Sequence, residues 1–273
     1  MSEARPVPDP LTARILEALR ESGRPLDDVT YRDLVPVSEL HNRGKQATVD
    51  LARLAEVQPG DHVLDVGCGI GGPARTLVAE FGCRVTGVDI SEEFCSAARA
   101  LNELVGLSGQ VSVRCADALA LPLEDELFDI VWTQHASMNV ADKQALFAEM
   151  YRGLKPGGKL ALHDVMAGPV QPIRFPVPWA AHPSVSFLES PEDIRRTIRE
   201  TGLGEIAWQD QTQLTEEWWR NVFERTAGKP PSPLNPGLVM GSQFPRMAHN
   251  MYCNILENRV AVVQALYRKS PTP

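Results

Sequence analysis

The chain has 273 residues, of which 43% are hydrophobic and 23% charged, and its formal net charge is −8. This composition is typical of a soluble globular protein with one α/β core and elaborations, and it gives no sign of a disordered or fibrous chain. The negative charge disfavours nucleic acid as a partner, and five cysteines without a C-x-x-C pair predict neither a disulfide framework nor a metal site.

The N-terminal part is predicted to be helical. Apolar residues recur at helical spacing over about 11–24 and 45–56, before the first predicted strand, so we expect residues 1–60 to form a helical cap with a polar, flexible stretch at 40–45. The opening MSEARPVPDP has no apolar signal-peptide core, and no apolar run reaches the length of a membrane span. The sequence therefore predicts a cytoplasmic protein without a membrane partner; a homodimer is left open.

From residue 61 onwards, short apolar runs alternate with helical segments. The predicted strands are HVLDVG, RVTGVD, VSVRCAD, FDIVWTQH and KLALHDV, and the predicted helices lie at about 73–80, 92–104 and 143–153. Continuous apolar runs are typical of parallel strands buried on both faces, connected by right-handed crossovers. A turn is predicted at 155–158, before the fifth strand. We expect a Rossmann-like, doubly wound α/β domain over residues 61–273.

The C-terminal part completes the predicted sheet. A helix is expected to begin at Ser190 and Pro191 and to end near Gly202, and EIAWQDQ and AVVQALYR are predicted as strands six and seven. The sheet would then have seven strands, mostly parallel, with an antiparallel last strand. Insertions at about 166–190 and 214–258 are rich in proline and aromatic residues, and we expect them to form an ordered lid over the site.

A glycine loop follows the first predicted strand. Gly67, Gly69 and Gly72 satisfy G-x-G-x-x-G, and Asp89 lies where a dinucleotide-binding fold places its ribose-binding acid. Taken alone, this pattern suits NAD equally well. Asp65, two residues before the first glycine, would repel a pyrophosphate but attract the ammonium and sulfonium groups of S-adenosylmethionine. The carboxylate therefore favours the sulfonium cofactor.

Four segments together resemble a known family. LDVGCGIGG, VTGVDIS, ADALALPLEDELFDIVW and LKPGGKLAL, between residues 61 and 164, are similar to class I S-adenosylmethionine-dependent methyltransferases. Within that family the chain resembles the small-molecule branch that includes sarcosine/dimethylglycine and tocopherol-type methyltransferases. The resemblance implies S-adenosylmethionine as cofactor, S-adenosylhomocysteine as product and a small-molecule methyl acceptor.

The resemblance also implies the cofactor residues. The methionine portion would be bound by Asp65, Gly67, Gly69 and Gln134, the ribose by Asp89, and the adenine by Ile90, Asp117 and Ala118. The residues themselves point independently to Asp89 and Asp117, because each ends a predicted strand at the carboxyl edge, where open α/β sheets bind ligands.

The acceptor is less well defined by the sequence. His135 follows Gln134 at the end of the fourth predicted strand, and it is either a catalytic base or a hydrogen-bonded structural residue. Tocopherol-type relatives place an acid at position 135 and a histidine where this chain has Asn139, so the resemblance does not carry an acceptor over. Further residues expected to contact the acceptor are His41, His163, Trp179, Trp219 and Tyr252. The aromatic residues suit a cationic amine or a planar aromatic acceptor alike.

The predicted function is methyl transfer by in-line displacement. N-methylation of a small amine and C- or O-methylation of a specialised metabolite both remain open. Two other classes stay as alternatives: an NAD-dependent oxidoreductase, which Asp65 opposes, and a cofactor-binding protein without catalytic activity.

Overall fold

A seven-stranded sheet runs through the centre of the computed structural model, which describes residues 9–271. The strands are β1 (His62–Val66), β2 (Arg84–Asp89), β3 (Val111–Cys115), β4 (Phe128–Gln134), β5 (Leu154–Ala167), β6 (Leu203–Asp210) and β7 (Val260–Lys269). Their order across the sheet is β3-β2-β1-β4-β5-β7-β6. Strands β1 to β5 pair in parallel, whereas β7 pairs antiparallel with both β5 and β6. The predicted Rossmann-like sheet with an antiparallel last strand is confirmed.

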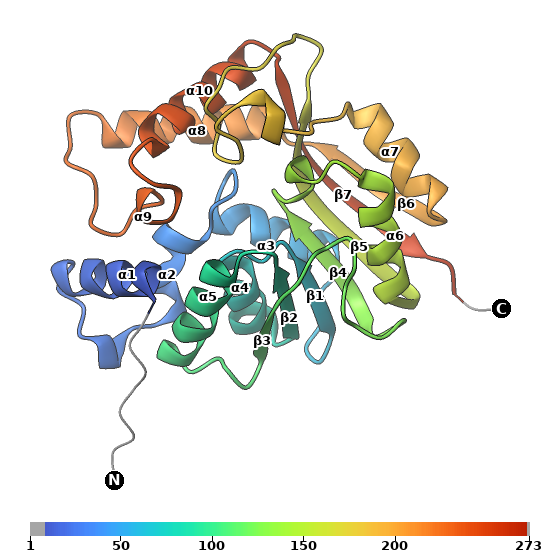
Figure 1. Ribbon diagram of the computed structural model, residues 1–273, viewed down its shortest axis with the longest axis horizontal. Helices are drawn as coiled ribbons and strands as arrows, with labels where there is room; N and C mark the ends of the chain where they lie inside the picture. The colour runs from blue at the N-terminus through green and yellow to red at the C-terminus, as the bar shows by residue number, and fades with distance from the viewer. Residues whose placement is uncertain (1–8, 272–273) are drawn as a thin grey trace.

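Helices cover both faces of the sheet (Figure 1). The helices are α1 (Pro10–Glu21), α2 (Tyr31–Ser38), α3 (Lys45–Leu54), α4 (Gly72–Phe81), α5 (Glu92–Leu104), α6 (Lys143–Gly153), α7 (Pro191–Glu200), α8 (Thr212–Thr226), α9 (Gly237–Met240) and α10 (Phe244–Leu256). On one face Leu51 of α3 and Leu77 of α4 pack against the sheet, and on the other Phe147 of α6 and Ile198 of α7 do so. The strands therefore carry apolar side chains on both faces, which explains their continuous apolar sequences.

The N-terminal helices pack against the start of the Rossmann-like unit. Leu11 and Ile15 of α1 and Leu34 of α2 share an apolar cluster with Ile70 of the glycine loop and Leu101 of α5. The segment between α2 and α3, predicted to be polar and flexible, instead carries buried polar side chains. The prediction was wrong at this point because the polar groups of the segment find partners inside the protein.

The two insertions form a layer that faces the sheet across the cavity described below. Figure 1 shows α8 and α10 side by side in the upper part of the view, with α9 near α1 and α2. Val177 from the first insertion and Trp219 and Met251 from the second pack together against Val262 of β7. The two insertions therefore share one apolar cluster.

One local prediction needs correction. The turn expected at 155–158 lies inside β5, because Leu154 already pairs with Phe128 and the register then shifts so that Lys159 pairs with Ile130. The glycines allow this bulge, in which Gly157 has a φ of 79°. Separately, no helix within residues 9–271 combines the length and apolarity needed to cross a bilayer.

Candidate active site

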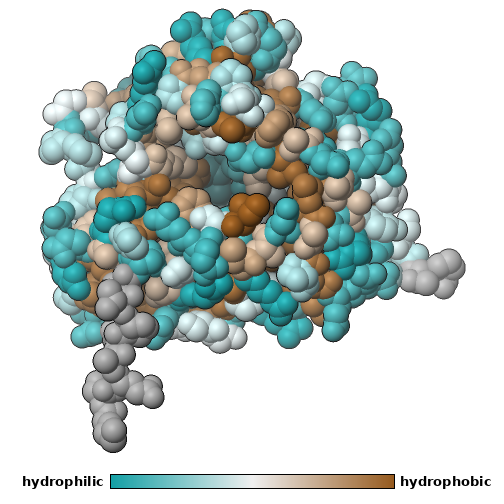
Figure 2. Space-filling view, viewed as in Figure 1, coloured by the Kyte–Doolittle hydropathy of each residue, from teal (hydrophilic) through white to brown (hydrophobic). Residues whose placement is uncertain are grey.

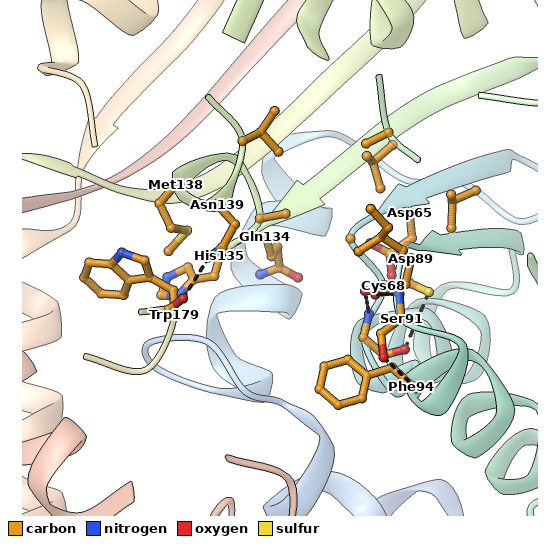
Figure 3. A pocket seen from close by; sticks show the side chains of 18 of the residues that line it. Asp65, Cys68, Asp89, Ser91, Phe94, Gln134, His135, Met138, Asn139 and Trp179 are labelled. Atoms are coloured by element: carbon orange, nitrogen blue, oxygen red, sulfur yellow. Dashed lines mark hydrogen bonds between the residues drawn. The ribbon is translucent and has the colours of Figure 1, made fainter. Parts of the chain in front are cut away.

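The carboxyl ends of β1, β2 and β4 open into a cavity of about 690 Å³. Figure 2 shows the hollow near the middle of the face seen in Figure 1, bordered by hydrophobic residues. In Figure 3, Asp65 and Asp89 lie on one side of this space, and His135, Met138 and Trp179 lie on the other. The residues assigned to the cofactor and those assigned to the acceptor thus meet in a single cavity.

The glycine loop brings the backbone close to this cavity. Gly67 has a φ of 79°, and a Cβ there would lie 2.4 Å from the Cβ of Ala136. Gly69 has a φ of 53°, and a Cβ there would meet nothing within 4 Å among the described residues. The space beside Gly69 is therefore available to a ligand, and the left-handed conformation at both positions favours glycine.

Asp65 is a buried carboxylate facing the cavity. Its side chain is 1% exposed, and its Oδ2 atom has no hydrogen-bond partner within residues 9–271. Burial raises the pKa of Asp65 to about 8, and the negative charges of Glu39 and Asp89 add to this effect. A cationic group of a ligand would satisfy the free oxygen and favour the ionised form.

Gln134 presents a complementary donor. Its Oε1 accepts a hydrogen bond from the indole Nε1 of Trp132 at 2.9 Å and lies 3.2 Å from the Thr48 hydroxyl, which donates to Glu39. Because an indole N–H can only donate, these contacts assign the amide orientation and turn Nε2 into the free group. This buried Nε2 has no partner in the described part of the chain. A free carboxylate acceptor at Asp65 and a free amide donor at Gln134 match the two charged groups of an α-amino acid.

The same side of the cavity also combines a second carboxylate with an exposed apolar side chain. Asp89 accepts hydrogen bonds from the backbone N–H groups of Gly69 and Ser91, each at 2.9 Å, and both carboxylate oxygens keep a second lone pair for a ligand. Ile90 is 73% exposed and lines the cavity. Asp117 and Ala118 line it as well. This grouping suits a ribose beside a flat base.

Sequence reasoning missed a buried carboxylate at the end of α2. Glu39 forms a contact of 2.9 Å with Nε2 of His41 and accepts hydrogen bonds from the hydroxyls of Thr48 and Thr76. Burial alone would raise the pKa of Glu39, but the hydrogen bond and charge of His41 and the two hydroxyl bonds lower it below its usual range. Because the partners come from α3 and α4, only the three-dimensional structure shows why a carboxylate stands here.

Three histidines meet next to this network. The ring of His135 stacks on that of His163, with centroids 5.0 Å apart, and lies edge-on to His41 at 5.9 Å. Burial and the charge of His41 hold the pKa of His135 well below its ordinary value. Its Nε2 atom has no hydrogen-bond partner among residues 9–271. No arrangement of three or more His, Cys, Asp or Glu side chains in the same residues is suited to a metal ion.

Both insertions contribute to the wall opposite the sheet. A smaller cavity of about 50 Å³ adjoins the first and shares His41, His135, Trp179 and Met240 with it. Trp219 lines this smaller cavity, and its indole donates a hydrogen bond to the side chain of Asn42 at 2.9 Å. The N-terminal segment and α8 are therefore joined at the site.

Two residues expected to contact the acceptor line neither cavity. His163 is completely buried behind His135, and Tyr252 packs against Phe223 on the far side of Trp219. His163 is therefore separated from both cavities by the rings of His135, which stacks on it, and His41, which lies edge-on to it at 5.7 Å.

The topology also bears on the NAD alternative. A dinucleotide-binding sheet has the order 3-2-1-4-5-6 with parallel strands, whereas here the antiparallel β7 lies between β5 and β6. Tyr151 and Lys155 have the Tyr-x-x-x-Lys spacing of some oxidoreductases, but neither lines the two cavities of the site. Lys155 instead forms an ion pair with Asp129 at 2.7 Å.

Comparisons with known proteins agree with this architecture. Residues 64–162 match the family model described as a methyltransferase domain. The methyltransferase GfsG of Streptomyces halstedii is 36% identical over 143 residues, which are 51% of each chain, so this chain matches only about half of that relative's length. Sarcosine/dimethylglycine N-methyltransferase of Halorhodospira halochloris is 29% identical and covers 69% of this chain, and 67% of that protein is covered in turn.

The similarity extends beyond the central domain. An uncharacterized protein of Haemophilus influenzae is 31% identical over 204 residues, which are 73% of this chain and 72% of that protein. A solved structure of geranyl diphosphate methyltransferase in complex with S-adenosylmethionine superposes with a TM-score of 0.66 at 23% identity, covering 82% of this chain and 85% of the other. The chain therefore belongs to the methyltransferases with a Rossmann-like fold.

Proposed function

We propose that the chain transfers the methyl group of S-adenosylmethionine to a small-molecule acceptor by in-line displacement and releases S-adenosylhomocysteine. The observation that carries this proposal is the pair of unsatisfied buried polar atoms, Oδ2 of Asp65 and Nε2 of Gln134, among the described residues. The carboxylate would hold the ammonium of the methionine portion, and the amide would donate to its carboxylate. The residues present therefore fit the cofactor.

We assign the remaining cofactor contacts from the same cavity. Gly67 and Gly69 would approach the methionine portion through their backbone, since the space beside Gly69 is open. Asp89 would accept hydrogen bonds from both ribose hydroxyls with its remaining lone pairs. Adenine would pack on the exposed side chain of Ile90, with Asp117 and Ala118 at its polar edge; these last two line the cavity beside Ile90.

The methyl group would then point toward His135 and the wall formed by the insertions. We propose that residues 166–190 and 214–258 act as a lid and residues 1–60 as a cap, because both contribute to the lining of the two cavities. Such a cover excludes water and aligns the acceptor, and alignment alone can supply about 7–11 kcal/mol of the barrier reduction. His135 would contact the acceptor, because its free Nε2 belongs to a side chain that lines both cavities.

Calorimetric titration of the purified chain tests the cofactor. We expect S-adenosylmethionine and S-adenosylhomocysteine to bind, adenosine to bind more weakly, and NAD not to bind. Preferential binding of NAD would instead support an oxidoreductase. A second measurement follows S-adenosylhomocysteine formation by mass spectrometry over a panel of amines, phenols and enols. Cofactor binding without product from any of these compounds would support the reading of a catalytically inactive binding protein.

A further inference from the structure

The acceptor end of the site is distinguished by the charges it lacks. Within residues 9–271, no lysine or arginine lines either cavity. Three carboxylates, Asp65, Asp89 and Asp117, line the larger cavity at the end assigned to the cofactor. The fourth, Glu39, lines the smaller cavity but is already engaged by His41 and two threonine hydroxyls. The acceptor end of the site therefore offers no charged side chain that is free to pair with a charge on the acceptor.

The same wall is rich in large apolar side chains. Met138, Trp179 and Phe187 line the larger cavity, and Met240 lines both. The smaller cavity ends against two indoles, a phenyl ring and a thioether of α8 and α10, from Trp218, Trp219, Phe244 and Met251. Figure 3 shows Met138 and Trp179 close to His135 on the side of the cavity opposite Asp65 and Asp89. Flat or branched apolar groups fit such a surface, because methionine and aromatic side chains adapt to their shape.

A charged acceptor would lose solvation here without recovering it. Moving a phosphate or carboxylate from water into a site without cations is strongly unfavourable, and the cost is recovered only through paired hydrogen bonds and opposite charges. The sulfonium of a bound cofactor would face the reacting atom, so it cannot also hold an anionic group elsewhere on the acceptor. The aromatic side chains would attract an ammonium-bearing acceptor by cation–π contact, but its ammonium would meet that sulfonium as a like charge, and a protonated amine has no lone pair with which to accept the methyl group.

We infer that the acceptor is an uncharged, mainly apolar molecule whose hydroxyl group faces Nε2 of His135. This inference rests on the proposed methyl transfer. In the reaction the hydroxyl oxygen forms a bond to the methyl carbon, the carbon–sulfur bond breaks with its electron pair going to sulfur, and the hydroxyl proton passes to Nε2 of His135. The positive charge lost from sulfur is thereby replaced by the proton on the imidazole, so the net charge of the closed site is unchanged. The acceptor named for the Halorhodospira relative carries a carboxylate and does not fit this wall.

Two matched probes test the charge of the acceptor. 1-Naphthol and 1-naphthyl phosphate share one apolar body and differ in charge, and their affinities are measured by calorimetry on the full chain saturated with S-adenosylhomocysteine. We expect 1-naphthol to bind at least tenfold more tightly than the phosphate. In the presence of S-adenosylmethionine, methylated naphthol should be detected by mass spectrometry at a higher rate than any product from sarcosine.

A charge introduced at the junction of the two cavities should reverse this preference. Met240→Lys places a cation where both cavities meet, so we expect weaker binding of 1-naphthol and at least tenfold tighter binding of 1-naphthyl phosphate. Met247→Lys is the matched control, because Met247 lies on α10 and lines neither cavity, and it should leave both affinities unchanged.

The outcomes separate this inference from the proposed function. If S-adenosylmethionine binds but the phosphate or sarcosine is preferred, the uncharged acceptor is wrong and methyl transfer stands. Equal affinities for the two naphthyl probes, or no binding of 1-naphthol up to its solubility, also overturn the inference. If S-adenosylmethionine itself does not bind, the proposed function fails.

Discussion

Binding of S-adenosylmethionine should release a proton from Asp65. In the unliganded protein this carboxyl has a pKa of about 8, chiefly because of burial and further because of the charges of Glu39 and Asp89. A carboxyl with this pKa is about 90% protonated at pH 7. The ammonium of the cofactor would stabilise the carboxylate and expel that proton.

The magnitude follows from the same pKa. Linkage predicts release of about 0.9 proton per cofactor bound at pH 7, and a dissociation constant that falls about ninefold between pH 6 and pH 7. Over this range the α-amino group of the cofactor stays mostly protonated, since such groups titrate at about 7.7–8.0. A carboxyl that is fully ionised in the unliganded protein would give no pH dependence of the dissociation constant over this range.

Calorimetry in phosphate and in Tris at pH 7 measures the released proton, because the two buffers differ in ionisation enthalpy. Asp65→Asn should bind the cofactor more weakly, with no proton release and no pH dependence between pH 6 and pH 7. Asp117→Asn is the matched control: it removes an exposed carboxylate of the same cavity and should reduce affinity while leaving the proton count unchanged. A wild-type protein that binds tightly without releasing a proton would refute the proposed contact at Asp65.

Four further substitutions test other parts of the site. Asp89→Ala should weaken cofactor binding by roughly 1.5–3 kcal/mol for each charge-assisted ribose hydrogen bond lost, and an unchanged calorimetric affinity in a folded variant would exclude Asp89 from the site. Gly67→Ala should lower the melting temperature, because its Cβ would overlap that of Ala136 and the left-handed backbone costs about 1–2 kcal/mol. Gly69→Ala carries a similar backbone cost but causes no overlap, and its methyl group would occupy space meant for the ligand. Gly67→Ala should therefore lose more stability than Gly69→Ala, and an equal loss in the two variants would contradict this expectation. His135→Ala should reduce turnover with nearly unchanged affinity for S-adenosylmethionine, and full turnover would make His135 structural.

The sheet and the helices around it were predictable because they follow simple periodic patterns. The helices α5 and α6 have the expected bounds, and their N-caps, Ser91 and Asp142, each accept a hydrogen bond from the third residue of the helix. Likewise Ser190 caps α7 as predicted. These signals are local, so the sequence carries them without reference to the rest of the fold.

The N-terminal segment was harder to predict. Helix α2 contains Pro36, which normally argues against a helix interior, and only the capping box of Thr30 and Asp33 marks its start. The Glu39 and His41 contact depends on hydroxyls from two later helices. Non-local pairing of this kind leaves no periodic pattern in the sequence. For the same reason the sequence could not predict that His163 is buried behind His135.

The division of the cavity lining along the chain has a consequence for how such proteins diverge. All of the residues that we assign to the cofactor lie between positions 65 and 134, inside the region that matches the family model. The aromatic wall at 179, 218 and 219 lies outside it, on insertions that meet the sheet mainly through one apolar cluster. Exchange of these insertions between family members would therefore change the molecule that is methylated without disturbing the methyl donor, which makes them natural units for recombination and for directed evolution.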